Sequence, residues 1–134
     1  MIHLSPLDEA SLEHLLRAPD VALAKICSNG PLIKSFLMPS LQQSLDFQRR
    51  VSSRAPWHGY LAIESESKLL VGICAFVGNP NEAGDVEIAY GIVPAFEGRG
   101  YATQMATALQ ALAFQTLKVR RVIAHTLPET NAST

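Results

Sequence analysis

The segment 86–103 constrains the fold of this chain more than any other part of it. A strand-like apolar run ends at Pro94, a short loop containing Gly98 and Gly100 follows, and an amphipathic helix opens at Tyr101. Glycines leave the backbone N–H groups of the loop uncovered, and the first N–H groups of a helix have no partner within it. Because bare donors at the positive end of a helix favour an anion, this segment predicts a site for a phosphorylated ligand.

The size and composition of the chain predict one folded domain over residues 1–134. Apolar residues make up 48% of the sequence and charged residues 17%, which favours a packed core over disorder. The net charge of −1 gives no electrostatic reason to expect nucleic acid or an anionic membrane as partner. The sequence has no signal peptide, no apolar run of membrane length and no cysteine pairing pattern. We therefore expect a soluble cytoplasmic protein.

The first part of the chain has helical periodicity, and we expect three helices there. Ser5-Pro6 predicts an N-cap followed by a first-turn proline, with Asp8 and Glu9 in the first turn. This helix would extend to Ala18. A second helix is expected over Asp20–Cys27, a third would begin at Ser40 and end before Pro56, and the break between them is Asn29-Gly30-Pro31.

From Trp57 onward the period of the sequence changes to that of strands. Strands are predicted over Trp57–Ile63, Leu69–Val77, Asp85–Val93 and Arg121–Leu127, with a helix over Tyr101–Leu117. The third strand alternates, so one face carries Val86, Ile88, Tyr90 and Ile92, and the other carries Glu87, Ala89, Gly91 and Val93. The order of elements indicates an α/β domain in which a crossover helix joins two parallel strands, neighbours or near-neighbours in the sheet.

Two familiar phosphate-binding motifs do not fit the glycine loop. A P-loop ends in Gly-Lys-Ser or Gly-Lys-Thr, whereas Gly100 is followed by Tyr101. A dinucleotide fingerprint needs a glycine three positions after Gly100, where this chain has Thr103. Neither an ATP-binding loop nor a Rossmann loop is therefore expected.

The loop instead resembles the acyl-CoA loop of the GNAT superfamily of N-acetyltransferases. The family pattern is Gln or Arg, two variable residues, Gly, a variable residue, then Gly or Ala, and this chain has Glu97-Gly98-Arg99-Gly100-Tyr101-Ala102. Glu-Ile-x-Tyr on the strand and Gly-Tyr-Ala-Thr at the helix start are most similar to the branch that acetylates ribosomal-protein N-termini at alanine. Asn131 and Ser133 are similar to the Asn-x-x-Ser segment that follows the next strand in many members.

The resemblance implies an α+β fold, a mixed and mostly antiparallel sheet flanked by helices. The family continues after this point with one helix and two strands, which complete the acceptor site. The sequence stops at residues 131–134, which are N-cap types. We therefore expect the single domain 1–134 to be incomplete at its C-terminus, with the last helix and strands missing.

The resemblance also implies which residues hold acetyl-CoA, the cosubstrate. The pantetheine amides would bond the backbone of Ile92 and Val93, and an N–H near Ile92 would stabilise the oxyanion of the tetrahedral intermediate. Glu97 departs from the family pattern and places a carboxylate near the diphosphate. Asn131 is also expected to contact the cofactor. The residues expected around the diphosphate are Gly98, Arg99, Gly100, Tyr101, Ala102 and Thr103.

Glu87 occupies the strand position at which the family carries a general base. Acetyl transfer needs one because the nucleophile is the neutral amine, and most amines are protonated at neutral pH. The alternative is a strand carboxylate that is solvated or paired with Arg121. His125 and His58 are competing bases, although a structural role is expected for each, and Cys74 is expected to pack in the core.

The reaction expected from these residues is direct transfer of an acetyl group from acetyl-CoA to a primary amine. The acceptor would be a protein N-terminus or a small-molecule amine, with no covalent enzyme intermediate and no metal. Two alternatives remain open. One is a non-catalytic module that binds acyl-CoA or a nucleotide; the other is a fragment completed by a partner chain, for instance in a homodimer, because a sheet ending after Leu127 exposes an edge.

Overall fold

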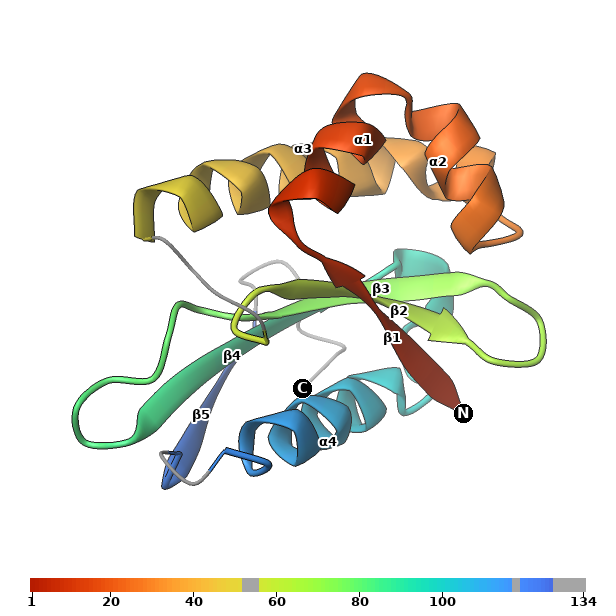
Figure 1. Cartoon of the computed structure of the whole chain (residues 1–134). Helices are drawn as coiled ribbons and strands as arrows, with labels where there is room; N and C mark the ends of the chain where they lie inside the picture. Colours follow the sequence, from red (N-terminus) through yellow and green to blue (C-terminus); the bar gives the residue numbers. More distant parts are fainter. Residues whose placement is uncertain (52–55, 117–118, 127–134) are drawn as a thin grey trace.

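The computed structural model describes residues 1–51, 56–116 and 119–126. Its strands are β1 (Ile2–Leu7), β2 (Gly59–Glu64), β3 (Leu70–Phe76), β4 (Asp85–Ile92) and β5 (Arg121–Thr126). Its helices are α1 (Glu9–Arg17), α2 (Pro19–Ile26), α3 (Gly30–Val51), α4 (Tyr101–Ala113) and the 3₁₀ turn η1 (Pro94–Phe96). The sheet lies between two helical layers, α1–α3 on one face and α4 on the other (Figure 1).

The described strands form one sheet in the order β1-β2-β3-β4-β5. Neighbours are antiparallel from β1 to β4, while β4 and β5 are parallel and are joined by α4. This confirms the predicted crossover between two parallel strands. The N–H of Ile2 donates to Oε1 of Gln104 at 3.1 Å, which ties α4 to the far edge of the sheet.

Each face of the sheet has its own apolar core, as the alternation of β4 predicts. Val86, Ile88 and Ile92 pack on the α4 side, whereas Val93 packs on the α1–α3 side. The largest buried side chains under α1–α3 include Leu7, Leu12, Leu15, Leu23, Leu37, Leu41 and Leu61. Those on the α4 side include Phe76, Ile88, Met105 and Leu109.

The predicted helix start at Ser5-Pro6 is wrong, because these residues lie in β1. Pro6 is tolerated there since β1 is an edge strand, where a missing N–H costs no ladder bond on the solvent side. The helix begins three residues later than predicted. Asp8 is the N-cap, and its Oδ1 accepts a hydrogen bond of 2.8 Å from the N–H of Ser11.

The predicted start of the third helix is also wrong, because α3 begins at Gly30 and includes Pro39. Pro31 falls in the first turn, where the missing N–H has no helical partner in any case. Pro39 does remove one bond from the interior. The helix continues through it because an apolar stripe is buried on both sides of the proline, at Ile33, Leu37, Leu41 and Leu45.

The remaining predicted elements exist with changed bounds, and the second helix, α2, lies one residue earlier than predicted. β2 starts at Gly59 and not at Trp57, and α4 ends at Ala113, followed by a turn. The final strand is seen to Thr126, and Leu127 lies outside the described residues. Asn131 and Ser133, which the family resemblance singled out, also lie outside them.

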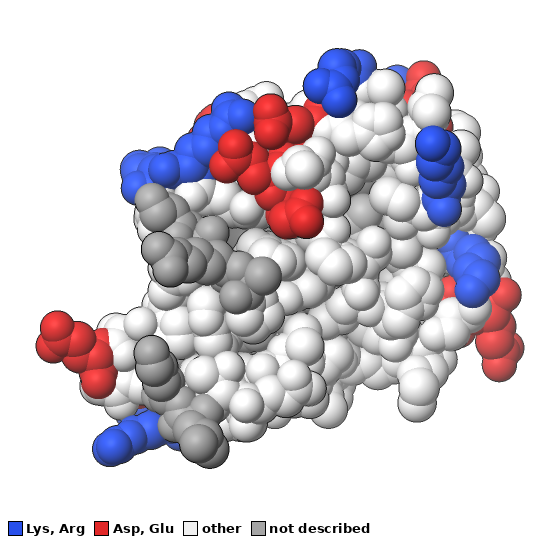
Figure 2. Space-filling model, viewed as in Figure 1, with Lys and Arg blue, Asp and Glu red and all other residues white. Residues whose placement is uncertain are grey.

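The face of the molecule shown in Figure 2 carries no large patch of one charge sign. Acidic and basic side chains are intermixed along the edge formed by the α1–α3 layer, and much of the face below them is uncharged (Figure 2). Arg49 lies 3.6 Å from a Glu9 oxygen and 3.4 Å from a Glu13 oxygen, which pairs α3 with α1. Within the described ranges, no helix is long and apolar enough to span a bilayer.

Candidate functional site

The glycine loop after β4 has the backbone geometry of an open anion site. Gly98 and Gly100 have φ of +77° and +82°, a conformation that side chains with a Cβ rarely adopt. A Cβ built on either glycine would meet no protein atom within 4 Å, so the surface of the loop faces open space. The loop therefore requires glycine for its conformation and leaves its amides accessible.

The N–H groups at the start of α4 have no partner among the residues that the structure describes. Gly100 is the N-cap and offers no side-chain acceptor, and the first bond back to it comes from the N–H of Gln104 at 3.2 Å. Among the described residues, no backbone acceptor is bonded to the N–H groups of residues 98–103. Six consecutive donors are thus available at the positive end of a 13-residue helix.

Three aromatic and basic side chains support this loop. The ring of Phe96 meets that of Tyr101 edge-on, with centroids 6.2 Å apart. The guanidinium carbon of Arg99 lies 5.6 Å from the Phe96 ring centroid, and Arg99 is exposed. A cation is therefore held beside the bare amides without a carboxylate partner among the described residues.

Ile92 and Val93, the two residues predicted to bond the pantetheine amides, differ in how their backbone groups are engaged. Val93 is engaged internally: its N–H donates to the Val71 carbonyl at 2.8 Å, and its carbonyl accepts from the Phe96 N–H at 2.8 Å. Since successive residues of a strand direct their N–H groups to opposite edges, Ile92 points toward the β5 side. The described β4–β5 pairing ends at Tyr90 and Thr126, so Ile92 lies beyond it.

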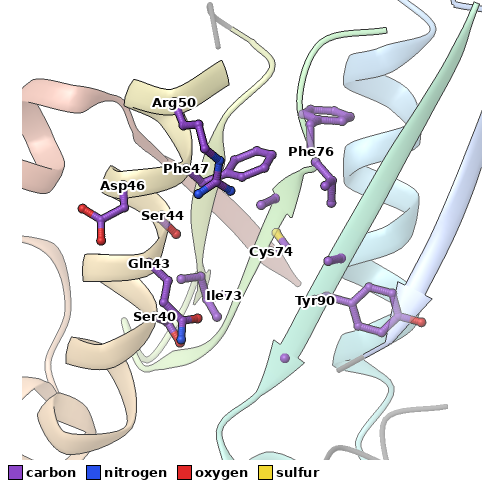
Figure 3. A pocket seen from close by; sticks show the side chains of 14 residues that line it. Ser40, Gln43, Ser44, Asp46, Phe47, Arg50, Ile73, Cys74, Phe76 and Tyr90 are labelled. Atoms are coloured by element: carbon purple, nitrogen blue, oxygen red, sulfur yellow. The ribbon is translucent and has the colours of Figure 1, made fainter. Parts of the chain in front are cut away.

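A cavity of about 460 Å³ lies on the other side of β4, between α3 and the β3–β4 pair. Figure 3 shows Phe47 and Arg50 of α3 over it, while Asp46 points away from the sheet and Tyr90 lies on the opposite face. Its lining residues are Ser40, Gln43, Ser44, Asp46, Phe47, Arg50, Ile73, Cys74, Ala75, Phe76, Val77, Ala89, Tyr90 and Gly91.

The cavity exists because the floor of the sheet is made of small residues. Ala75 pairs with Ala89 across β3 and β4, and Ile73 pairs with Gly91. The two alanines have only methyl side chains and the glycine has none. The sheet therefore cannot fill the space beneath the polar side of α3. Gly91, at one end of the cavity lining, directly precedes Ile92, whose backbone N–H faces β5.

Sequence comparison assigns the chain to a family. A family model described as the acetyltransferase (GNAT) domain matches residues 2–134. The chain is a member of the GNAT acetyltransferase family. No curated protein sequence is similar enough to count as a match.

Solved structures show the same α+β GNAT fold. An acetyltransferase of the GNAT family from Bacillus anthracis is 19% identical, with 96% of this chain and 71% of that chain covered and a TM-score of 0.55. The dodecameric spermidine N-acetyltransferase of Vibrio cholerae is 15% identical, with 96% and 71% covered and a TM-score of 0.56. The ribosomal L7/L12 α-N-protein acetyltransferase, in complex with coenzyme A, is 17% identical, with 92% and 69% covered and a TM-score of 0.55.

In this GNAT domain, Glu87 lies on the cavity side of β4. It precedes Ala89 by two residues and therefore lies on the same face of β4, but it is not one of the residues that line the cavity, and it is half-buried. The ion pair that the structure describes for Arg121 is with Asp85 and not with Glu87. Arg121 binds Asp85 through two bonds, Nε to Oδ1 at 3.1 Å and Nη2 to Oδ2 at 2.8 Å.

Of the two competing bases, His58 lies in another part of the domain, and the side chain of His125 is not described. His58 is buried and its Nδ1 lies 2.8 Å from the Gly59 carbonyl oxygen, beside a second cavity under β1, β2 and α4. The backbone of His125 pairs with Ala89, and the structure does not describe its side chain. His58 therefore lies away from the cavity under α3, and no site role is assigned to His125.

Three other side chains considered from sequence have structural roles. Burial raises the pKa of the Cys74 thiol far above its usual range, which keeps it protonated and argues against a cysteine nucleophile. Trp57 packs edge-on against Phe76 with centroids 4.9 Å apart. The Tyr60 hydroxyl donates to the Pro56 carbonyl at 2.7 Å, and burial raises the pKa of Tyr60 to about 12.

The wall that α3 gives to the cavity was missed by sequence reasoning. Ser40, Ser44 and Phe47 follow one another at spacings of four and three residues, and Arg50 comes three residues later. The signal was an aromatic residue on an otherwise polar helical stripe. Within the described part of the chain, no group of three or more His, Cys, Asp or Glu side chains gathers to hold a metal ion.

Proposed function

We propose that this GNAT domain is an acetyl-CoA-dependent N-acetyltransferase that acts on a primary amine. One observation carries the proposal: β4 connects two sites of complementary chemistry. Its C-terminal end leads into six amide donors to which no described acceptor is bonded, and its residues 89–91 line a cavity on the α3 face. The first site suits a diphosphate, and the second suits the molecule that receives the acetyl group.

The coenzyme would bind by its diphosphate to the N–H groups of residues 98–103, with the exposed Arg99 nearby as a counter-charge. Its pantetheine arm would run between β4 and β5 and bond the backbone of Ile92. We assign this contact to Ile92 rather than to Val93, because both backbone groups of Val93 are engaged within the protein. A contribution from Asn131 stays a prediction.

Transfer would begin when the neutral amine attacks the thioester carbonyl carbon. The C–N bond forms and the C–S bond breaks, and coenzyme A leaves as a thiolate that takes up a proton. Glu87, directly or through a water, would accept the proton that the ammonium must lose first. The N–H of Ile92, directed to the β5 side, would donate to the oxyanion as it develops.

The acceptor would be a protein N-terminus or a small-molecule amine. The structural relatives favour no single one, since one is a ribosomal-protein enzyme and another a spermidine enzyme. A homodimer belongs to the same proposal, because the spermidine enzyme assembles into a dodecamer.

The test is release of coenzyme A thiol from acetyl-CoA in the presence of a panel of primary amines. Glu87→Gln keeps the shape of the side chain and removes its basicity, so we expect kcat to fall at least about a hundredfold at neutral pH. Glu82→Gln, an exposed carboxylate in the turn between β3 and β4, is the matched control and should retain wild-type turnover.

Thermal stabilisation by coenzyme A separates the proposal from its alternative. A transferase should be stabilised by the coenzyme and release thiol with an amine. Stabilisation without thiol release from any amine would identify a binding module instead, and the absence of stabilisation would remove the proposed diphosphate site.

A further inference from the structure

Two adjacent arginines near the end of α3 have opposite surroundings. Arg49 is paired with Glu9 and Glu13 of α1. Arg50 is exposed, lies over the cavity and stacks on Phe47, with its guanidinium carbon 5.4 Å from the ring centroid. No carboxylate that the structure describes is within ion-pair distance of Arg50. A cation therefore stands at the cavity, and its guanidinium has no carboxylate partner among the described residues.

The other charged residue of the cavity lining does not offset this charge. Asp46 points away from the sheet, and its Oδ1 accepts a hydrogen bond of 3.1 Å from Nε2 of Gln42 on the outer side of α3 (Figure 3). The remaining polar lining groups of α3 are neutral, namely Ser40, Gln43 and Ser44. The polar wall of the cavity thus offers a cation and neutral hydrogen-bonding groups.

The opposite wall is apolar and small. Ala75 and Ala89 form its centre, and the cavity volume of about 460 Å³ is in the range of sites for small molecules. Contact with the Phe47 ring also restricts the freedom of the guanidinium, which reduces the entropy lost when it forms two parallel bonds to a carboxylate. The arrangement fits a small molecule with an anionic group at one end and an aliphatic body.

We infer that the acceptor is a small amine that also carries a carboxylate, that is, a free amino acid. The inference rests on the proposed function and specifies the acceptor of that same site. The carboxylate would bind Arg50 bidentately, the side chain would lie against Phe47 and the alanines, and the amine would face β4. A polyamine would bring positive charge to Arg50 and is disfavoured.

The experiment compares acceptors that differ only in the carboxylate. The panel contains L-alanine, L-leucine, L-phenylalanine and L-glutamate, the corresponding α-carboxamides, and spermidine, each with acetyl-CoA. Replacing the carboxylate by an amide lowers the pKa of the neighbouring amine and raises its neutral fraction, so intrinsic reactivity favours the amide. We expect kcat/KM for at least one free amino acid to exceed that for its amide about tenfold or more.

Variants of the two arginines assign this preference to a residue. Arg50→Met keeps the apolar stem and removes the charge, so kcat/KM for the amino acid should fall about tenfold or more, while the amide changes less than about twofold. Arg50→Lys should restore part of the loss, because it returns the charge without the planar fork. Arg49→Met should leave both substrates as in wild type.

The outcomes separate this inference from the proposed function. Turnover of spermidine or of the amides in preference to every free amino acid would overturn the inference and leave the transferase intact. Equal loss of both substrate types in Arg50→Met would also overturn it, because the residue would then act on the fold or on the coenzyme. Absence of coenzyme A stabilisation and of any turnover would overturn the proposed function, and the inference with it.

Discussion

Asn29 joins the start of α3 to the start of β3, and its removal should be costly. Its Nδ2 donates to the Leu70 carbonyl at 3.1 Å, and its Oδ1 accepts from the Leu70 N–H at 2.8 Å. The side chain of Asn29 is 5% exposed and Leu70 is fully buried, so water does not reach either bond easily. Asn29→Ala would leave a buried donor and a buried acceptor without partners.

The expected loss follows from these two groups. An unsatisfied buried polar group costs about 1–3 kcal/mol, so leaving two of them in Asn29→Ala should lower the free energy of unfolding by roughly 2–6 kcal/mol. For a domain of this length that corresponds to a fall in Tm of roughly 10 °C. α3 and β3 are two walls of the cavity. We therefore also expect a larger fold-change in KM for the amine than in the coenzyme A concentration that gives half-maximal thermal stabilisation.

Urea unfolding followed by circular dichroism measures the loss, with the m-value as a check on the unfolded state. Asn81→Ala is the matched control, since Oδ1 of Asn81 also accepts two backbone bonds, from Ala83 and Asp85, but at an exposed turn. Asn29→Asp keeps the volume but replaces the Nδ2 donor by an oxygen that faces the Leu70 carbonyl oxygen, so it should also destabilise the domain. A loss below about 1 kcal/mol for Asn29→Ala, or an equal loss for Asn81→Ala, would refute the reasoning from buried unsatisfied groups.

Two further predictions concern the sheet and the pH dependence of stability. A Cβ on Gly72 would lie 2.5 Å from the Gly91 carbonyl oxygen, so Gly72→Ala should destabilise by about 1–3 kcal/mol in thermal melts, whereas Gly59→Ala, with no atom closer than 3.6 Å, should not. The Ser67 N–H, with the Ser67 hydroxyl, holds the pKa of Glu64 near about 2, below its usual 4.5. The unfolded state then binds more protons between these values, so stability should fall as pH drops from 4.5 to about 2, and Glu64→Gln should flatten this part of the Tm profile; an unchanged profile would contradict it.

The part of the fold around the glycine loop could be predicted from sequence because its signals are local. Alternation assigned the two faces of β4, the glycines marked the loop, and helical spacing marked α4. β1 could not be found in this way. Its pairing partner is β2, more than fifty residues away, and Ser5-Pro6 read alone has the pattern of a helix start.

The candidate site divides along the same line. Residues 98–103 and Glu87 could be named because strand, loop and helix are consecutive in the chain. Arg50 and Phe47 could not, because their role depends on α3 lying across β3 and β4, which no local pattern shows. Pro39 also hid the true length of α3 from sequence analysis. The bond lost at this proline is compensated by burial of Leu37 and Leu41, which the local sequence does not show.

The division of α3 into two stripes has a consequence for how such a domain can diversify. One stripe, with Leu37, Leu41 and Leu45, is buried in the core, while the neighbouring stripe with Phe47 and Arg50 lines the cavity. Exchanges on the second stripe leave the packing of the first untouched, so acceptor choice can drift at little thermodynamic cost. Mutations on the second stripe can therefore change substrate specificity without earlier mutations that stabilise the fold.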